Sequence, residues 1–363
     1  MKDNKKRVII AALGKAYLEN KDELNRQYNV IGVLDKIRKV EEKKWINISN
    51  ICTCKFDYVV ITSMKFFFEI RKELIEAGVD EKKIIGTDAI NVCIADIKTY
   101  DGELDRRDRT SGTDDELYSL VCLASAENEQ VFSHFRNNLI YINTLEHVSY
   151  VQGTQYLVEM EQCPQKEFSN MEWKNILRND LYGGGVRYAY DICNETLNVS
   201  PNTIRYAKVL QDILINFEGI NSIVEIGVGY GGQCRIITSL ISTILTYDLI
   251  DLPEALKLAK KYIEHFEECT GKVNYINGIE LEEKISCDLV ISNYAFSELK
   301  KYVQDSYFNN VLSNAKHGYI TWNRYSENNL DGYSLEEILD KLGHVKVIPE
   351  RPLTSRGNCI IIW

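Results

Sequence analysis

A glycine-rich turn that joins an apolar run to an amphipathic segment constrains this chain more than any other feature. Residues 222–226 are a short apolar run typical of a buried strand, and residues 233–241 have the pattern of a helix. The turn between them, residues 227–232, contains four glycines. Since glycine has no Cβ, the backbone of such a turn can come close to a ligand. The sequence therefore predicts a strand–loop–helix unit that binds a small molecule.

A carboxylate at the end of the next predicted strand supports this interpretation. Asp251 lies about 20 residues beyond the glycine turn, where nucleotide-binding sheets place an acceptor for ribose hydroxyls. Asp251 could instead cap the helix that begins at Pro253, and Asp248 competes with it for the ribose role. Ribose contact by Asp251 is favoured, so the turn and the acid together indicate an adenosine-containing cofactor.

Length and charge limit the classes of partner. A chain of 363 residues favours two domains. Its formal net charge of −10 argues against a nucleic acid or an anionic membrane surface as partner, because both attract an excess of Lys and Arg. No run reaches the roughly 18 apolar residues of a membrane span, and no long apolar leader follows Met1. We therefore expect a cytoplasmic protein without a membrane span.

The cysteines do not predict a metal centre. Most of the 10 cysteines stand singly in apolar runs, which is typical of buried free thiols. Cys52 and Cys54 form the only close pair, and no second pair completes a zinc site. Asp180, Glu298 and Asn323 could supply oxygen ligands to a divalent metal, but no spacing demands one. No metal is predicted.

Composition and periodicity divide the chain into four segments. Residues 1–97 alternate strands and helices, which indicates a small Rossmann-like α/β domain with a parallel sheet. Residues 98–114 are polar and glycine-containing, as expected of a linker. Residues 115–199 favour a helical segment that covers the substrate site, and residues 200–363 form a second α/β domain around the glycine turn.

The second α/β domain is predicted to contain a seven-stranded sheet with one antiparallel strand. Its last two strands are separated by too few residues for a parallel crossover, so they must run antiparallel. This is the Rossmann-like sheet of class I S-adenosylmethionine-dependent methyltransferases, whereas a dehydrogenase domain would normally be all-parallel. The predicted strands are residues 222–226, 244–250, 272–277, 288–293, 318–323, 345–348 and 358–363.

Several ordered motifs add a more specific resemblance. They are EIGVGYGGQCR at 225–235, DLPEAL at 251–256, ISNYAFSEL at 291–299, GYITWN at 318–323, PNTIRY at 201–206, and Asn179-Asp180 followed by Gly183. Together they resemble the sugar O-methyltransferase family of bacterial surface-polysaccharide clusters, over about half of the chain. One departure is Gly184-Gly185, where a proline is expected. The first 95 residues more loosely resemble Rossmann-like domains appended to polysaccharide-modifying enzymes.

The resemblance implies S-adenosylmethionine as the methyl donor. The acidic residue inside the first strand lies near the methionine moiety in class I methyltransferases, and a buried carboxylate is costly unless it has such a partner. Asn293 ends the fourth strand, beside the expected sulfonium. The predicted cofactor-binding residues are Glu225, Gly227, Gly229, Tyr230, Gly231, Asp251, Leu252 and Asn293.

Transfer to a sugar hydroxyl benefits from a general base, because the hydroxyl is a poor nucleophile at neutral pH. Glu298 is the first candidate, although a place at a helix N-terminus would lower its pKa. Asp180 is the second, with a loop cap or an arginine partner as its alternative role. Tyr294 is predicted to line the acceptor pocket. His134 and His147 are interpreted as packing residues of the middle segment.

The predicted activity is methyl transfer from S-adenosylmethionine to a sugar hydroxyl of a nucleotide-linked or glycan-linked sugar. Arg205, Tyr206 and Asn323 are predicted to bind substrate hydroxyls or a phosphate. The aromatic-rich middle segment could also serve as the interface of a homo-oligomer.

Two other classes of function stay open. One is a non-catalytic scaffold that binds a nucleotide sugar. The other is an NAD-dependent sugar epimerase or dehydrogenase that uses the first domain, whose loop at residues 11–15 has only Gly14 where a dinucleotide binder has three glycines.

Overall fold

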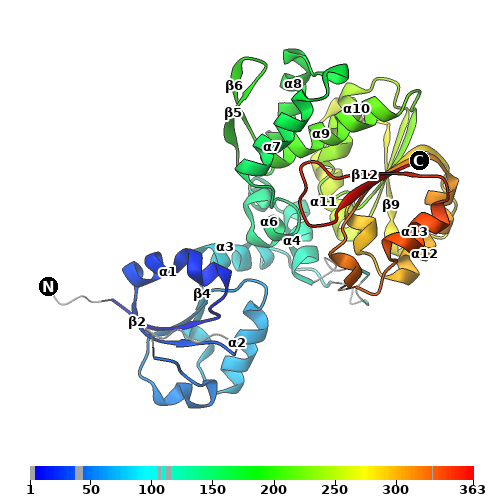
Figure 1. Ribbon diagram of the computed structural model, residues 1–363. Helices are drawn as coiled ribbons and strands as arrows, with labels where there is room; N and C mark the ends of the chain where they lie inside the picture. Colours follow the sequence, from blue (N-terminus) through cyan, green and yellow to red (C-terminus); the bar gives the residue numbers. More distant parts are fainter. Residues whose placement is uncertain (1–4, 37–43, 105–107, 109, 112–115, 329) are drawn as a thin grey trace. The chain divides into compact units, whose positions relative to one another are not determined.

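The computed structural model describes residues 1–363 except 1–4, 37–43, 105–107, 109, 112–115 and 329. The chain divides into two compact units (Figure 1). The N-terminal unit comprises residues 1–98 with 138–140, and the C-terminal unit comprises residues 99–137 with 141–363. The segment predicted as a linker, residues 98–114, lies partly outside the described residues.

The N-terminal unit is built on a four-stranded parallel sheet in the order β2-β1-β3-β4. Every residue from Val8 to Ala11 in the central strand is fully buried, as expected when both faces of a parallel sheet are covered. Its elements are β1 Arg7–Ala11, α1 Lys15–Gln27, β2 Asn29–Leu34, β3 Tyr58–Ile61, α2 Phe67–Glu76, β4 Ile84–Gly86 and α3 Asp88–Ile97.

The C-terminal unit contains the predicted seven-stranded sheet, in the order β12-β13-β11-β10-β7-β8-β9. All neighbours pair in parallel except β13, which runs antiparallel to both β11 and β12. The predicted fold class is therefore confirmed. The strands are β7 Ser222–Ile226, β8 Thr246–Asp251, β9 Val273–Asn277, β10 Cys287–Asn293, β11 Ala315–Trp322, β12 Lys346–Pro349 and β13 Cys359–Ile362.

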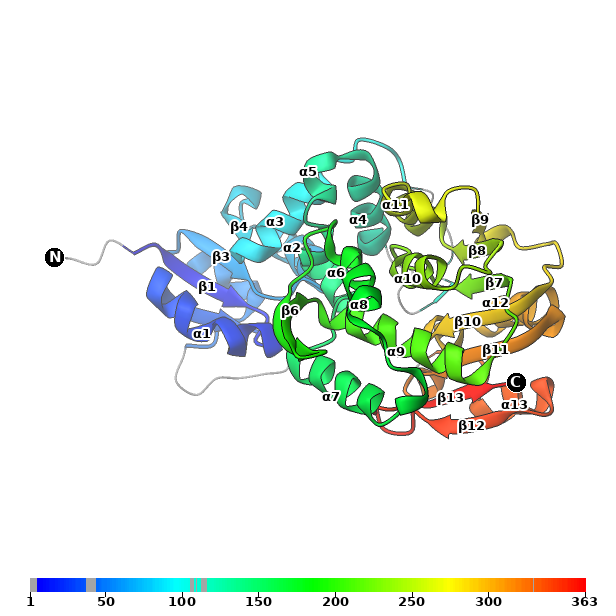
Figure 2. The same cartoon turned by 90° about the horizontal axis from the view of Figure 1, so that it is seen from above.

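Helices cover this sheet on both faces (Figure 2). One core cluster of buried residues joins strand residues such as Val224, Val290 and Ile320 to Val303 and Ile338 of the C-terminal helices. Because both faces of the sheet are covered, successive residues of the central strands are buried, which explains their apolar runs. The helices that follow the middle segment are α9 Pro201–Asn216, α10 Gly232–Leu240, α11 Pro253–Ile263, α12 Lys301–Asn310 and α13 Leu335–Leu342.

The middle segment packs on the sheet domain and is not wholly helical. Helix α4 contacts α11, α7 contacts α9, and α8 contacts α10. Residues 188–199, predicted to be helical, form an antiparallel hairpin whose turn holds Cys193 and Asn194 at positive φ. The segment comprises α4 Glu116–Glu127, α5 Glu129–Phe132, α6 Leu139–Thr144, α7 Tyr150–Glu161, α8 Asn170–Leu177, β5 Tyr188–Ile192 and β6 Glu195–Val199.

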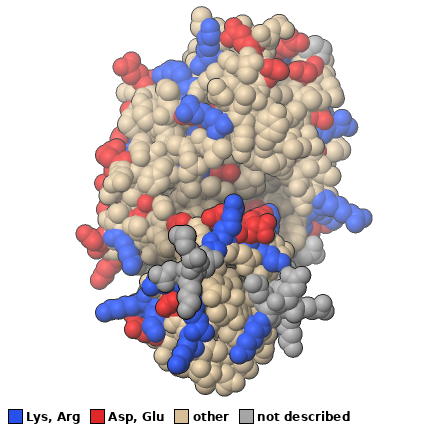
Figure 3. Space-filling view, turned by 90° about the vertical axis from the view of Figure 1, so that its left-hand side faces the viewer, with Lys and Arg blue, Asp and Glu red and all other residues tan. Residues whose placement is uncertain are grey.

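The two units differ in charge. Residues 1–98 contain 19 Lys and Arg against 15 Asp and Glu, so the negative charge of the chain resides in the C-terminal unit. Figure 3 shows Lys and Arg side chains spread over the exposed face of the N-terminal unit. Within the described part of the chain, none of the helices combines the length and the apolar character needed to cross a bilayer.

Candidate functional site

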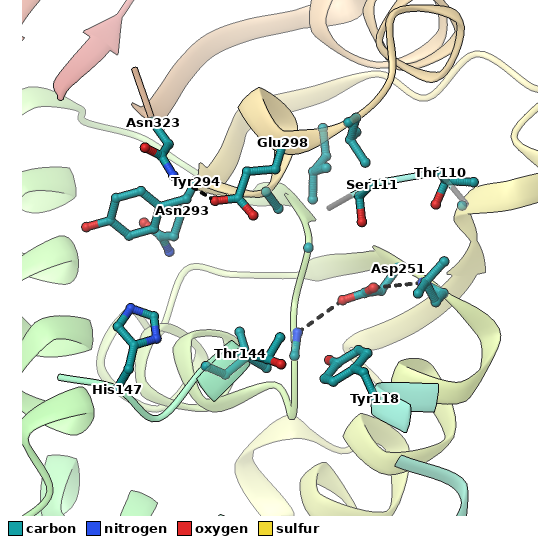
Figure 4. Close-up of a pocket in the computed structure, with 18 of the residues that line it drawn as sticks. Thr110, Ser111, Tyr118, Thr144, His147, Asp251, Asn293, Tyr294, Glu298 and Asn323 are labelled. Atoms are coloured by element: carbon teal, nitrogen blue, oxygen red, sulfur yellow. Dashed lines mark hydrogen bonds between the residues drawn. The ribbon is translucent and has the colours of Figure 1, made fainter. Parts of the chain in front are cut away.

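A cavity of about 400 Å³ opens at the carboxyl ends of the parallel strands of the C-terminal unit (Figure 4). Gly227 follows β7, Asp251 ends β8, Asn293 ends β10 and Asn323 follows β11, and all four line it. This volume is typical of small-molecule sites. The carboxyl edge is also where open α/β sheets bind their ligands. The cavity is therefore the candidate functional site.

The glycine turn forms the floor of this cavity in a conformation that side chains disfavour. Gly227 has a φ of +76° and Gly229 a φ of +56°. A Cβ on Gly227 would lie 2.0 Å from the Cβ of Ala295, the residue that follows Tyr294 beyond β10. The turn after β7 and the turn after β10 therefore touch, which brings Asn293 next to the glycines.

Gly227→Ala is expected to destabilise the protein. The left-handed conformation costs about 1–2 kcal/mol for a residue with a Cβ, and the contact with Ala295 adds a steric cost. Gly219→Ala is the matched control, because Gly219 has a φ of +67° but open space around its Cβ position. Thermal unfolding should show a larger loss for Gly227→Ala than for Gly219→Ala. Equal losses would mean that the close contact is absent.

Asp251 ties the glycine turn to β8. Its Oδ2 accepts hydrogen bonds from the amides of Val228 (2.7 Å) and Gly229 (3.1 Å), and its Oδ1 accepts one from Leu252 (2.7 Å). Burial raises the pKa of Asp251 to about 6, against the lowering effect of these amides. Helix α11 has Leu252 at its N-cap, so the capping alternative for Asp251 does not describe this geometry. Asp248 accepts from Asn274 and does not line the cavity.

Asn293 presents an unused acceptor in the same cavity. Its Oδ1 atom is buried and has no hydrogen-bond partner among the described residues. A buried amide oxygen without a partner is costly, so this atom is a natural acceptor for a ligand donor. The next residue, Tyr294, has a φ of 69°, which is uncommon for a residue with a bulky side chain. Strain of this kind often accompanies functional turns.

Glu298 and Asn323 form a polar pair beside Tyr294 and Asn293 (Figure 4). The Nδ2 of Asn323 donates to the Oε1 of Glu298 over 3.0 Å. Glu298 ends a 3₁₀ turn, Ala295–Glu298, and α12 begins only at Lys301, so Glu298 does not lie at the start of a helix as predicted. Burial raises the pKa of Glu298 despite the hydrogen bond from Asn323. A carboxylate with a raised pKa is a better proton acceptor than one stabilised by a helix N-terminus.

Nine of the predicted residues line the cavity and five do not. The nine are Glu298, Tyr294, Gly227, Gly229, Asp251, Leu252, Asn293, Arg205 and Asn323. The five that lie elsewhere are Asp180, Glu225, Tyr230, Gly231 and Tyr206.

Asp180 belongs to a buried ion-pair network below the site. Its Oδ1 accepts from Arg136 Nη1 (2.9 Å) and Thr203 Oγ1 (2.7 Å), and its Oδ2 accepts from the amide of Ser200 (2.7 Å). The arginine-partner alternative thus describes Asp180, whose carboxylate is engaged outside the cavity lining. The Arg136 guanidinium also lies 4.9 Å from the ring centroid of Tyr230, which is fully buried.

Glu225 is buried behind the glycine turn. Its Oε2 accepts a hydrogen bond from the hydroxyl of Tyr247 over 2.7 Å, and only 2% of the residue is exposed. Burial raises the pKa of Glu225 to about 8, although the bond from Tyr247 lowers it. Burial therefore favours the protonated form of this carboxyl group, which bonds to Tyr247 of β8 rather than lining the cavity.

Glu225→Gln is expected to make the free energy of unfolding less dependent on pH. The folded pKa of about 8 exceeds the ordinary value of 4.5, so the native state binds the proton more tightly than the unfolded state. This stabilisation is complete below pH 4.5 and is lost as the pH rises through 8, with a magnitude of about a few kcal/mol. Denaturant unfolding at several pH values should show a steeper loss in the wild type than in Glu225→Gln. Parallel curves would contradict the buried, protonated state.

Several residues of the middle segment line the cavity but were not predicted from the sequence. His147 faces Asn293 across the cavity, and Tyr118 of α4 lies near Asp251 (Figure 4). Burial, followed by the nearby Arg205 charge, lowers the pKa of His147 to about 4, so this imidazole is neutral. Periodicity places such residues on helices but does not reveal which face meets the sheet. No local signal separated His147 from a packing histidine.

The turn after β1 in the N-terminal unit does not repeat this arrangement. Ala12 has a φ of 70° where a glycine is usual, and the Leu13 amide donates to Asp35 Oδ2 over 2.6 Å. The hydroxyl of Thr62 also donates to the carbonyl of Ala12. The backbone of this turn is thus engaged within the unit. Among the described residues of the whole chain, no three His, Cys, Asp or Glu side chains gather as a metal site.

Comparison with known proteins gives partial similarities. Residues 4–85 match the family described as C2185-like, N-terminal. No curated protein matches the sequence. A SAM dependent methyltransferase from Aquifex aeolicus is 17% identical with a TM-score of 0.33, and the match covers 43% of this chain and 87% of that one.

Two other solved structures are similar to the same extent. PigF with SAH is 13% identical with a TM-score of 0.33, over 42% of this chain and 60% of that one. M. capricolum TrmK, in complex with the natural cofactor product S-adenosyl-homocysteine, is 15% identical with a TM-score of 0.30, over 42% of this chain and 66% of that one. The fold of the C-terminal unit is assigned from its own strand order and register. The C-terminal unit has the Rossmann-like fold of class I methyltransferases, a seven-stranded sheet with one reversed strand.

Proposed function

We propose that the C-terminal unit is an S-adenosylmethionine-dependent O-methyltransferase that acts on a sugar hydroxyl. One observation carries the proposal: Asp251 and Asn293 line one cavity beside the glycine turn, and the buried Oδ1 of Asn293 has no hydrogen-bond partner among the described residues. The choice of S-adenosylmethionine among nucleotide cofactors is supported by the sheet topology and by the ordered motifs. The sugar acceptor is supported by the resemblance and by the polar lining described below.

The residues of the cavity fit the cofactor at two points. Asp251 can accept a ribose hydroxyl, since each carboxylate oxygen has two lone pairs and the amides of Val228, Gly229 and Leu252 leave one of them free, on Oδ1. Asn293 Oδ1 can accept from the ammonium group of the methionine moiety, which would satisfy its missing hydrogen bond. Gly227 lines the same cavity as both residues.

The pair formed by Glu298 and Asn323 supplies the base. When bound, S-adenosylmethionine supplies an activated methyl group to an acceptor placed in line with it. Glu298 then accepts the proton that leaves the attacking hydroxyl, and Asn323 fixes the orientation of the carboxylate through its 3.0 Å hydrogen bond. Because Glu298 is largely buried, its proton affinity is higher than that of an exposed glutamate.

The lining at the acceptor end suits a molecule with many hydroxyl groups. It combines amide and hydroxyl side chains with a tyrosine ring, and sugars bind through such groups. The polar residues at this end are Gln152, Tyr294, Asn323, Thr354, Ser355 and Asn358. The acceptor sugar would be nucleotide-linked or glycan-linked.

The proposal is tested by measuring S-adenosylhomocysteine release from the full chain with a panel of sugars, nucleotide sugars and oligosaccharides. Release that depends on one acceptor, with a methyl ether in the product, is the expected result. Cofactor binding without release for any acceptor would favour the non-catalytic scaffold. Methylation at nitrogen, sulfur or carbon would contradict O-methyl transfer.

A further inference from the structure

One cationic side chain lies among the residues that line the cavity. Arg205 extends from the second turn of α9 and is only 7% exposed. Its guanidinium carbon lies 5.9 Å from the ring centroid of Tyr294 and 5.5 Å from that of Tyr206. The other charged side chains among the described lining residues are Asp251 and Glu298. Among the described lining residues, Arg205 is thus the buried positive centre of the cavity.

This guanidinium has no counter-ion within the described part of the chain. Arg205 forms no ion pair there, and its buried Nε atom has no hydrogen-bond partner. Burial opposes its charge, but Tyr206, Tyr294, Tyr156 and Glu146 raise its pKa above the usual value. Arg205 therefore stays protonated, and a buried charge without a partner is strongly destabilising.

The nearest carboxylates are already engaged by other donors. Glu146 accepts from Arg136 (2.8 Å) and from Asn202 (2.8 Å). Glu350 accepts from the hydroxyl of Tyr294 and from the amide of Thr354 (3.0 Å). Neither carboxylate pairs with Arg205. The neighbouring His147 is held neutral, so it neither competes with the cation nor balances it.

The position of Arg205 assigns it to the acceptor end of the cavity. Asp251 lies near Tyr118 on one side, whereas Tyr294, Asn323 and His147 lie on the other (Figure 4). Arg205 contacts Tyr294, whose hydroxyl is bound to Glu350 between β12 and β13. An arginine fork binds carboxylates and phosphates through paired hydrogen bonds.

We propose that the acceptor is an acidic sugar, a uronate or a sugar phosphate, and that Arg205 binds its anionic group. This inference rests on the proposed function and narrows its substrate class. The methionine end of the cofactor also carries a carboxylate, so the experiment must separate the two sources of negative charge.

The test compares the wild type with Arg205→Met and Arg205→Lys, and uses Arg187→Met as a control with the same change of charge at an exposed position. Calorimetry first measures the affinity for S-adenosylhomocysteine. Ligand-observed NMR then measures the binding of glucuronate, glucose 6-phosphate and glucose, with and without saturating S-adenosylhomocysteine.

We expect the wild type to bind at least one of the two anionic sugars about tenfold or more tightly than glucose. Arg205→Met should lose this preference, Arg205→Lys should keep part of it, and both should bind S-adenosylhomocysteine as the wild type does. That unchanged affinity also shows that the variants are folded. Arg187→Met should behave as the wild type.

Three results would overturn the inference. In the first, the wild type binds glucose and both anionic sugars equally well. In the second, the wild type binds neither anionic sugar at millimolar concentration. In the third, Arg205→Met loses affinity for S-adenosylhomocysteine, which would assign the arginine to the cofactor. Absence of S-adenosylhomocysteine binding in the wild type would instead contradict the proposed function. The preference for anionic sugars and its dependence on Arg205 can still be measured by NMR without the cofactor.

Discussion

Asp251→Ala is expected to weaken S-adenosylmethionine binding by about 100-fold or more while the fold is retained. The substitution removes a carboxylate acceptor for ribose hydroxyls, and hydrogen bonds to charged groups contribute about 1.5–3 kcal/mol each. It also removes the hydrogen bonds that the amides of Val228 and Gly229 donate to Asp251 in the wild type, which hold the glycine turn in place. Titration calorimetry measures the affinity, and circular dichroism checks the fold.

Asp248→Ala is the matched control for this experiment. Asp248 lies on the same strand and bonds to Asn274 at 2.7 Å, but it does not line the cavity. We expect its affinity for S-adenosylmethionine to stay within about twofold of the wild type. If Asp248→Ala lost the affinity and Asp251→Ala kept it, the ribose role would belong to Asp248.

Glu298→Gln is expected to lower kcat by about 10²–10⁴-fold with little change in cofactor affinity. Those factors are typical of the loss of a general base. Glutamine preserves the size of the side chain and its hydrogen bond to Asn323 in one amide orientation, so the cavity keeps its shape. Steady-state kinetics with the identified acceptor, together with calorimetry for the cofactor, separate the two effects.

The pH dependence of the wild-type rate is a second test of Glu298 as the base. Glu298 acts as a base only when deprotonated, and burial raises its pKa above the ordinary glutamate value. The rate should therefore fall as the pH drops through this raised pKa, and this limb should be missing in Glu298→Gln. An unchanged limb in the variant would assign it to another group, and an unchanged kcat would exclude Glu298 as the base.

The site residues at the carboxyl ends of the strands could be predicted from the sequence, because each is marked by the residues next to it in the chain. The strands are short segments rich in apolar and β-branched residues, and each functional residue at the carboxyl edge ends such a segment or directly follows it. Gly227, Asp251, Asn293 and Asn323 are found in this way, and all line the cavity. The short connection before β13 likewise predicts the reversed strand.

Tertiary packing explains what the sequence did not reveal. Asp180 is adjacent to Asn179 in a family-like motif, but Arg136, 44 residues earlier, takes its carboxylate in the folded chain. Glu225 faces Tyr247 of the neighbouring strand and so points into the core. His147 reaches the cavity only because the middle segment packs on the sheet domain. Contacts between residues so far apart leave no local pattern.

Binding of S-adenosylmethionine to the intact wild-type chain tests the central claim most directly. Calorimetry at high micromolar ligand should show one site per chain in the C-terminal unit, with affinity reduced in Asp251→Ala and retained in Asp248→Ala. NADH, titrated in parallel, should give no comparable heat. A folded wild-type protein that gives no heat with S-adenosylmethionine, or one that binds NADH instead, would contradict the assignment of this cavity to the methyl donor.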